Sequence, residues 1–142
     1  MVTRDDVESF LDRLTPSGAA VREVDQTMWA VRPTGALDFD VVVSINPPVL
    51  VLRIDVMPLP TDAAQLATLT RRLLELNATD LVHGSYGIEN ESVVLSEALE
   101  LSHLEFEEFL ASYESMTLAL PTHLRELAHF RDAATTPATE AR

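Results

Sequence analysis

Two neighbouring apolar runs constrain the fold of this chain more than any other feature. Residues 39–45 and 49–57 are rich in valine, leucine and isoleucine, and Asn46-Pro47-Pro48 separates them. β-Branched residues favour strands, and a short proline-containing break between two such runs predicts an antiparallel pair. Both runs are too continuously apolar for a sheet with one face in water. Something must cover them, and we favour a second subunit or a client protein over the N-terminal helix.

More strands are expected on either side of this pair. Residues 21–31 form another apolar run, in which Asp25-Gln26 is a turn or a bulge, so we expect three strands in succession. Runs at 81–88 and 92–101 flank a polar turn and predict a hairpin. Glycine inside a strand marks a bulge or a close approach of another backbone, and Gly84 and Gly87 lie in the first of these two runs.

Helices are predicted where apolar residues recur every three or four positions. They cover residues 3–14, 61–77 and 102–129. Thr61-Asp62 begins the second helix and Asn77 ends it, whereas Ser102-His103-Leu104-Glu105 matches a capping box at the start of the third. Pro121 either kinks the third helix or breaks it.

The resulting order, α-β-β-β-α-β-β-α, predicts an α+β fold: a five-stranded antiparallel sheet with helices packed on it. Residues 1–131 are expected to form a single domain. Residues 132–142 lack core-forming side chains and are expected to form a flexible C-terminal tail.

Composition excludes several kinds of chemistry. The 142 residues contain no cysteine and no lysine, so disulfides, thiolate nucleophiles, cysteine zinc sites, Schiff bases and the P-loop lysine are absent. The net charge is −13, which disfavours direct binding of nucleic acid or of an anionic membrane. The apolar residues 49–52 are far shorter than the roughly 20 residues that span a bilayer, and no targeting signal is evident. We therefore expect a cytoplasmic protein.

Charge is unevenly distributed along the chain. No arginine lies between Arg72 and Arg125. The carboxylates in this span are Glu75, Asp80, Glu89, Glu91, Glu97, Glu100, Glu105, Glu107, Glu108 and Glu114. We interpret them as an uncompensated negative surface, which serves either solubility or the steering of a basic partner.

Catalytic and metal-binding signals are weak. His123, Glu126 and His129 share a helix face, and Glu126 and His129 have the Glu-x-x-His spacing of carboxylate metal sites. Such a site needs a second set of ligands that the sequence does not supply, so a polar helix face is the better interpretation. The Gly84-Ser85-Tyr86-Gly87 segment lacks the lysine and the helix of a phosphate-binding loop. We predict no catalytic residue, no metal ligand and no cofactor.

A partner-binding surface is instead predicted from the apolar sheet residues and part of the acidic span. Trp29, the only tryptophan, is either a core residue or a binding anchor. The predicted partner-binding residues are Trp29, Val41, Val43, Leu50, Leu52, Glu97, Glu100, Glu105 and Glu108.

Residues 61–130 also carry a family resemblance. Its motifs are Leu73-Leu74-Glu75-Leu76-Asn77, Gly84-Ser85-Tyr86-Gly87-Ile88, Val93-Val94-Leu95, Leu99-Glu100-Leu101 and the helix with Glu108-Phe109. With the element order, they resemble the type III secretion chaperone-like superfamily, in particular its YbjN-type branch. The resemblance implies a small acidic α+β protein, commonly a homodimer, that binds other proteins and has no enzymatic activity. Secretion chaperones hold an extended client segment, whereas YbjN-type members act outside secretion systems.

The leading hypothesis is therefore a chaperone- or adaptor-like module that binds another protein, such as a basic, nucleic-acid-binding one. Two alternatives stay open. One is a small metal-binding protein or enzyme that uses His123, Glu126 and His129. The other is a nucleic-acid mimic, whose carboxylates occupy the basic groove of a DNA-binding protein.

Overall fold

The computed structural model of the chain describes residues 1–35 and 38–135, with side chains as far as residue 132. The elements in chain order are α1 (Arg4–Asp12), the 3₁₀ turn η1 (Thr15–Ser17), β1 (Ala20–Asp25), β2 (Met28–Arg32), β3 (Val41–Asn46), β4 (Val49–Pro58), α2 (Ala63–Thr79), β5 (Ser85–Glu89), β6 (Ser92–Glu100) and α3 (Phe106–Thr135). Helix α3 thus continues into the segment expected to be a flexible tail, and residues 136–142 of that segment lie outside the described residues. No helix of the described part has the length and apolar character needed to cross a membrane.

The strands form one antiparallel sheet, as predicted, but it has six strands in the order β1-β2-β3-β4-β6-β5. The expected strand at 21–31 is two strands, because a tight turn at Gln26-Thr27 reverses the chain. The carboxylate of Asp25 stabilises this turn by accepting a hydrogen bond from the Thr27 amide at 2.8 Å. The turn was visible in the sequence, but it separates two paired strands instead of bending one.

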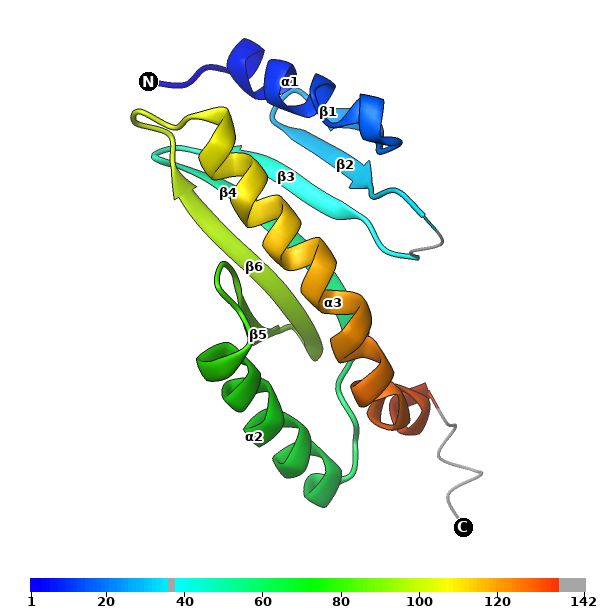
Figure 1. The fold of residues 1–142 in the computed structure, drawn as a ribbon. Helices are drawn as coiled ribbons and strands as arrows, with labels where there is room; N and C mark the ends of the chain where they lie inside the picture. The colour runs from blue at the N-terminus through cyan, green and yellow to red at the C-terminus, as the bar shows by residue number, and fades with distance from the viewer. Residues whose placement is uncertain (36–37, 136–142) are drawn as a thin grey trace.

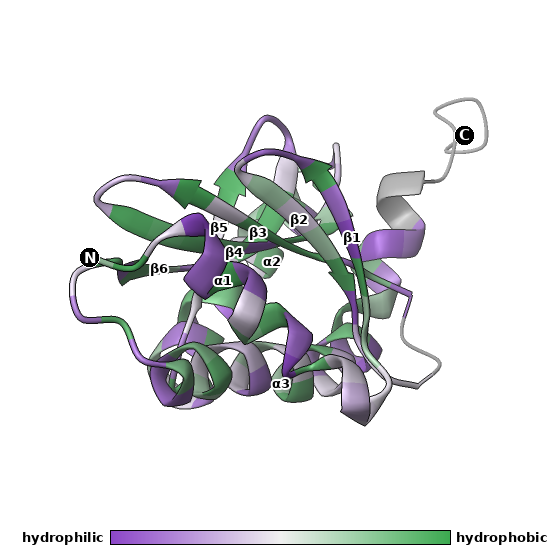
Figure 2. Ribbon diagram, turned by 90° about the horizontal axis from the view of Figure 1, so that it is seen from above, coloured by the Kyte–Doolittle hydropathy of each residue, from purple (hydrophilic) through white to green (hydrophobic). Residues whose placement is uncertain are grey.

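The apolar pair β3 and β4 lies at the centre of the sheet and is antiparallel, as expected. Helices α1 and α3 lie on the same side of the sheet, and α3 runs diagonally across it (Figures 1 and 2). Side chains alternate between the two faces of a strand, so every second residue of the central strands points toward these helices. The hydrophobic core fills the space between the sheet and the helices.

Pro121 lies inside α3, which is a single helix of 30 residues. Leu120 before the proline is fully buried, and Leu127 after it is almost fully buried. Both sides of the proline therefore pack on the same core, and this packing outweighs the cost of one missing backbone hydrogen bond.

The third helix begins four residues later than the capping pattern indicated, at Phe106 instead of Ser102. His103 has a φ of 62°, a left-handed conformation that a helix cannot include. The carboxylate of Glu108 accepts a hydrogen bond from the Glu105 amide at 3.1 Å, which is the reciprocal half of a capping box. The capping interaction exists, but Glu105 and Glu108 supply it.

Helix α2 is joined to the edge strand β5 through Asn77. This residue lies inside the helix, which ends at Thr79, so it is not the predicted stop. Its side chain accepts from the Tyr86 amide at 2.7 Å and donates to the Tyr86 carbonyl at 3.1 Å. The side-chain amide of Asn77 therefore bonds the backbone groups of Tyr86 that a further strand would otherwise pair with.

Candidate functional site

The apolar residues that were predicted to bind a partner lie in the core. Trp29 is 2% exposed and Val41, Val43, Leu50 and Leu52 are 0% exposed. The prediction that they form an accessible patch is wrong, because α1 and α3 of the same chain cover the face on which they lie. Trp29 is thus a core residue, with the Arg4 guanidinium 5.2 Å from the centroid of its ring.

The predicted acidic residues do not form one flank. Glu97 lies on the helix-covered face, where its carboxylate accepts from the Gly84 amide at 2.6 Å. Glu100 is three positions further along β6 and therefore points to the opposite face. Only Glu105 and Glu108 lie together, at the start of α3, where both are exposed.

The acidic span is partly neutralised by arginines of α2 and β4, so it is not wholly uncompensated. Glu75 lies within ion-pair distance of Arg71 and Arg72, and Glu89 pairs with Arg53 of β4. Six other glutamates of this span form no ion pair within the part of the chain that the structure describes. They are Glu91, Glu100, Glu105, Glu107, Glu108 and Glu114.

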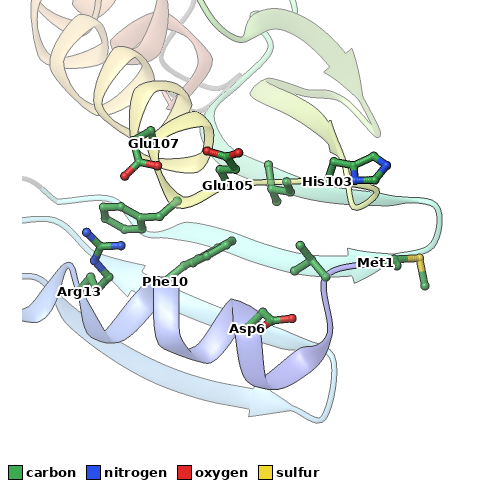
Figure 3. Close-up of a pocket in the computed structure, with 10 residues that line it drawn as sticks. Met1, Asp6, Phe10, Arg13, His103, Glu105 and Glu107 are labelled. Carbon is green, nitrogen blue, oxygen red and sulfur yellow. The ribbon is translucent and has the colours of Figure 1, made fainter.

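A pocket of about 450 Å³ lies between α1 and the start of α3 (Figure 3). Phe10 and Phe106 line it and contact each other with ring centroids 5.9 Å apart, and the Arg13 guanidinium lies 3.7 Å from the Phe106 centroid. The residues that line it are Met1, Val2, Asp6, Phe10, Arg13, His103, Leu104, Glu105, Phe106 and Glu107. Sequence reasoning missed this pocket, because nothing in the local pattern shows that residues about 95 positions apart meet.

A second exposed apolar surface lies on α2 and β5. Leu74 is 68% exposed and Ile88 53% exposed, and both line a cavity of about 230 Å³. Thr70, Leu73, Tyr86 and Gly87 complete its lining, so the cavity contains no carboxylate.

Strand β1 leaves one edge of the sheet open. It is the terminal strand of the sheet, and all of its residues except Val21 are exposed. At the opposite end of the sheet, α2 contacts β5 and the Asn77 side chain occupies the outward backbone groups of Tyr86. The two ends therefore differ: β1 offers unpaired backbone groups to another strand, and β5 is partly covered.

The three residues of the alternative metal site, His123, Glu126 and His129, make separate contacts. His123 is 3% exposed, with Nδ1 2.7 Å from the Tyr86 hydroxyl and Nε2 3.2 Å from the Asp80 carboxylate. A carboxylate only accepts, so Nε2 donates to Asp80, and the tautomer that carries its proton on Nε2 accepts from the Tyr86 hydroxyl at Nδ1. Glu126 instead accepts from Arg72 at 2.9 Å, and His129 is exposed beside Phe130. Among the described residues no group of three or more histidine and acidic side chains could hold a metal ion.

The surroundings of this network also affect ionisation. Burial raises the pKa of Tyr86, and the nearby charges of Asp80 and Glu126 act in the same direction. Hydrogen bonds from Thr79 and His123 lower the pKa of Asp80. The network thus keeps a neutral phenol inside the protein and a carboxylate at its surface, and it joins α2, β5 and α3.

Comparisons with known proteins extend this description. The family model CesT_Tir_1, of the type III secretion chaperones, matches residues 2–133. Among solved structures, a chain of the "Crystal Structure of the ExsC-ExsE Complex" is similar, with 16% identity and a TM-score of 0.46. That similarity covers 92% of this chain and 97% of the other. No curated protein sequence matches this chain.

Proposed function

This chain belongs to the CesT_Tir_1 family of type III secretion chaperones, and we propose that it binds a partner polypeptide in a chaperone-like or adaptor-like role without catalysing a reaction. The open edge of β1 is the observation that carries this proposal. An extended segment of another protein can add to such an edge through backbone hydrogen bonds, with its side chains supplying specificity. Strand β5 is a poorer acceptor, because Asn77 already bonds the backbone of Tyr86.

The partner is proposed to be basic. The chain has a net charge of −13, and Glu105, Glu107 and Glu108 are exposed at the start of α3 without a cationic partner among the described residues. Opposite charge accelerates encounter and selects against acidic competitors. Screening by salt weakens this attraction, so the association rate is expected to fall as the salt concentration rises.

We also propose that the protein is a homodimer that acts in the cytoplasm. Two copies of so acidic a chain repel each other, and they meet at least cost where carboxylates are absent. The surface formed by Leu74, Ile88 and the cavity between them meets this condition and is apolar. Membership of the YbjN-type branch stays a prediction, as do the single domain over residues 1–131 and the nucleic-acid mimic.

The strand-addition proposal is tested by placing a charge on the open edge. A partner is first captured at low salt and identified, and its affinity is then measured for Val24→Asp and for Val82→Asp. Val24 lies in β1 and is 48% exposed, whereas Val82 is 82% exposed and lies in the loop before β5. Both substitutions remove the same apolar side chain and add the same charge.

Val24→Asp replaces the exposed apolar side chain of β1 against which side chains of an added strand would pack, so we expect it to weaken partner binding about tenfold or more, and Val82→Asp much less. Equal affinities of the two variants would contradict binding at the β1 edge. Recovery of no polypeptide at either low or high salt would contradict the protein-binding role itself.

A further inference from the structure

We propose that the pocket between α1 and the start of α3 receives an arginine side chain of the partner polypeptide. This inference rests on the protein-binding function proposed above and names the chemistry of one contact. The pocket combines aromatic rings from both helices with carboxylates that project beside them (Figure 3).

The aromatic part of the pocket already binds a guanidinium. Arg13 of α1 lies over the ring of Phe106 at 3.7 Å from its centroid, which is the geometry of a cation–π contact. Phe10 contacts Phe106, and its other ring neighbour is Phe109, with centroids 5.8 Å apart. The rings are therefore held in place by the core, and their exposed parts form a preorganised floor.

The charges around this floor are not balanced. Three carboxylates, those of Asp6, Glu105 and Glu107, line the pocket, together with two cationic groups, the Arg13 guanidinium and the N-terminal amino group of Met1. Asp6 is engaged by Thr3, whose amide and hydroxyl donate to its carboxylate at 2.8 and 3.0 Å. Glu105 and Glu107 are exposed and lie in no ion pair with Arg13, so two carboxylates remain for a further cation.

Arginine fits this combination better than other side chains. A guanidinium stacks on an aromatic face and donates to carboxylates in a planar fork, whereas an ammonium group is more strongly hydrated. An acidic side chain would be repelled by the three carboxylates. A volume of about 450 Å³ is within the usual range for small-molecule pockets, so it can accept a side chain together with its flanking backbone.

The test uses short blocked peptides as probes: Gly-Arg-Gly, Gly-Lys-Gly and Gly-Leu-Gly. Nuclear magnetic resonance titrations of the full chain would report the affinity of each. The arginine peptide is expected to bind most tightly and to shift the ring signals of Phe10 and Phe106. Binding of the leucine peptide as tightly as the arginine peptide, or shifts elsewhere than at the pocket, would overturn the proposal.

Two substitutions are expected to act in opposite directions, which loss of folding cannot produce. Glu107→Gln removes a carboxylate and should weaken binding of the arginine peptide roughly two- to fivefold, as for an exposed ion pair. Arg13→Gln removes a competing cation from the Phe106 ring and should strengthen binding. Glu114→Gln is the charge-matched control, because Glu114 is an exposed residue of α3 that does not line the pocket. An unchanged affinity in Glu107→Gln would overturn the proposal.

The same variants, measured with the captured partner, separate this inference from the proposed function. If Val24→Asp weakens partner binding and Glu107→Gln does not, the protein-binding role stands and the arginine pocket is wrong. If Glu107→Gln weakens partner binding more than Glu114→Gln, the arginine contact belongs to the interface.

Discussion

At the scale of single residues, a buried histidine joins three elements of the fold. His123 accepts from the Tyr86 hydroxyl at 2.7 Å and donates to Asp80 at 3.2 Å, so all its ring nitrogens are satisfied. Its function is thus structural: it fixes α3 against β5 and the end of α2. The helix face that resembled half of a metal site is occupied by these contacts and by the Arg72–Glu126 pair.

Removing the Tyr86 hydroxyl tests this role. Tyr86→Phe leaves Nδ1 of His123 buried without a donor, and we expect the free energy of unfolding to fall by about 1–3 kcal/mol. Urea unfolding followed by circular dichroism measures the change. Tyr113→Phe serves as a control, since among the described residues no side chain hydrogen-bonds to the Tyr113 hydroxyl, and only its backbone carbonyl accepts, from Thr117. A Tyr86→Phe variant as stable as the unmodified protein would contradict a structural role for this hydrogen bond.

The raised pKa values of two buried tyrosines predict how the free energy of unfolding changes at alkaline pH. Burial raises the pKa of Tyr113 to about 12, with a smaller contribution from Glu114, and burial also raises the pKa of Tyr86. The pKa of tyrosine in an unfolded chain is about 10. A pKa that is higher in the folded state gives stabilisation that is complete below this value and is lost as the pH rises through the folded pKa.

We therefore expect the free energy of unfolding to decrease above about pH 10, and to decrease less steeply in Tyr86→Phe. Urea unfolding at a series of pH values measures both slopes. Identical slopes for the two proteins would show that Tyr86 does not ionise on unfolding in this range.

At the scale of elements, the packing of the segment before β5 against α3 depends on one glycine. Gly84, just before β5, has a φ of +87°, and a Cβ added to it would lie 2.9 Å from Cγ of Met116 in α3. A side chain at this position is strained by its backbone and crowded by the helix. The sequence predicted a bulge or a close approach of another backbone at this glycine, whereas the neighbour in the structure is the Met116 side chain of α3.

Gly84→Ala is therefore expected to destabilise the fold by about 1–3 kcal/mol through strain and overpacking. Gly87→Ala is the matched control, because its Cβ would lie 4.0 Å from Val94 and its φ is not positive. Thermal unfolding compares the two variants. Equal melting temperatures would mean that Met116 moves aside at no cost.

The elements also show which local signals were reliable. The valine-rich pair β3 and β4, the hairpin β5–β6 and the three helices follow from periodicity, which depends on nearby residues. The errors lie at boundaries. The turn at Gln26-Thr27 divides a predicted strand, and the left-handed His103 delays α3. At Pro121 the sequence could not choose between a kink and a break, because packing of α3 on the sheet decides the outcome.

At the scale of the whole molecule, three exposed surfaces differ in their chemistry. Strand β1 is open, the pocket beside α1 is negatively charged, and the surface of α2 and β5 is apolar. If the apolar surface joins two copies, each dimer carries two β1 edges free for partners.

Dimer formation is tested by placing a charge on that surface. Leu74→Glu is expected to give a monomer in sedimentation experiments, because two buried carboxylates cannot be paired there. Leu118→Glu is the control: Leu118 is 75% exposed, lies on α3, and its substitution adds the same charge. A monomeric unmodified protein, or a Leu74→Glu variant that still dimerises, would contradict the proposed interface.

The sequence by itself determined the three helices and the antiparallel strands apart from their boundaries, the excess of carboxylates, the absence of lysine and cysteine chemistry, and the family resemblance over residues 61–130. Each of these depends on residue identity or on local spacing. Only the tertiary structure decided that α1 and α3 bury Trp29, Val41, Val43, Leu50 and Leu52, which arginines neutralise the acidic span, and that Phe10 meets Phe106. The physical reason is that burial and ion pairing depend on contacts between residues far apart in the chain, and these contacts leave no periodic signal.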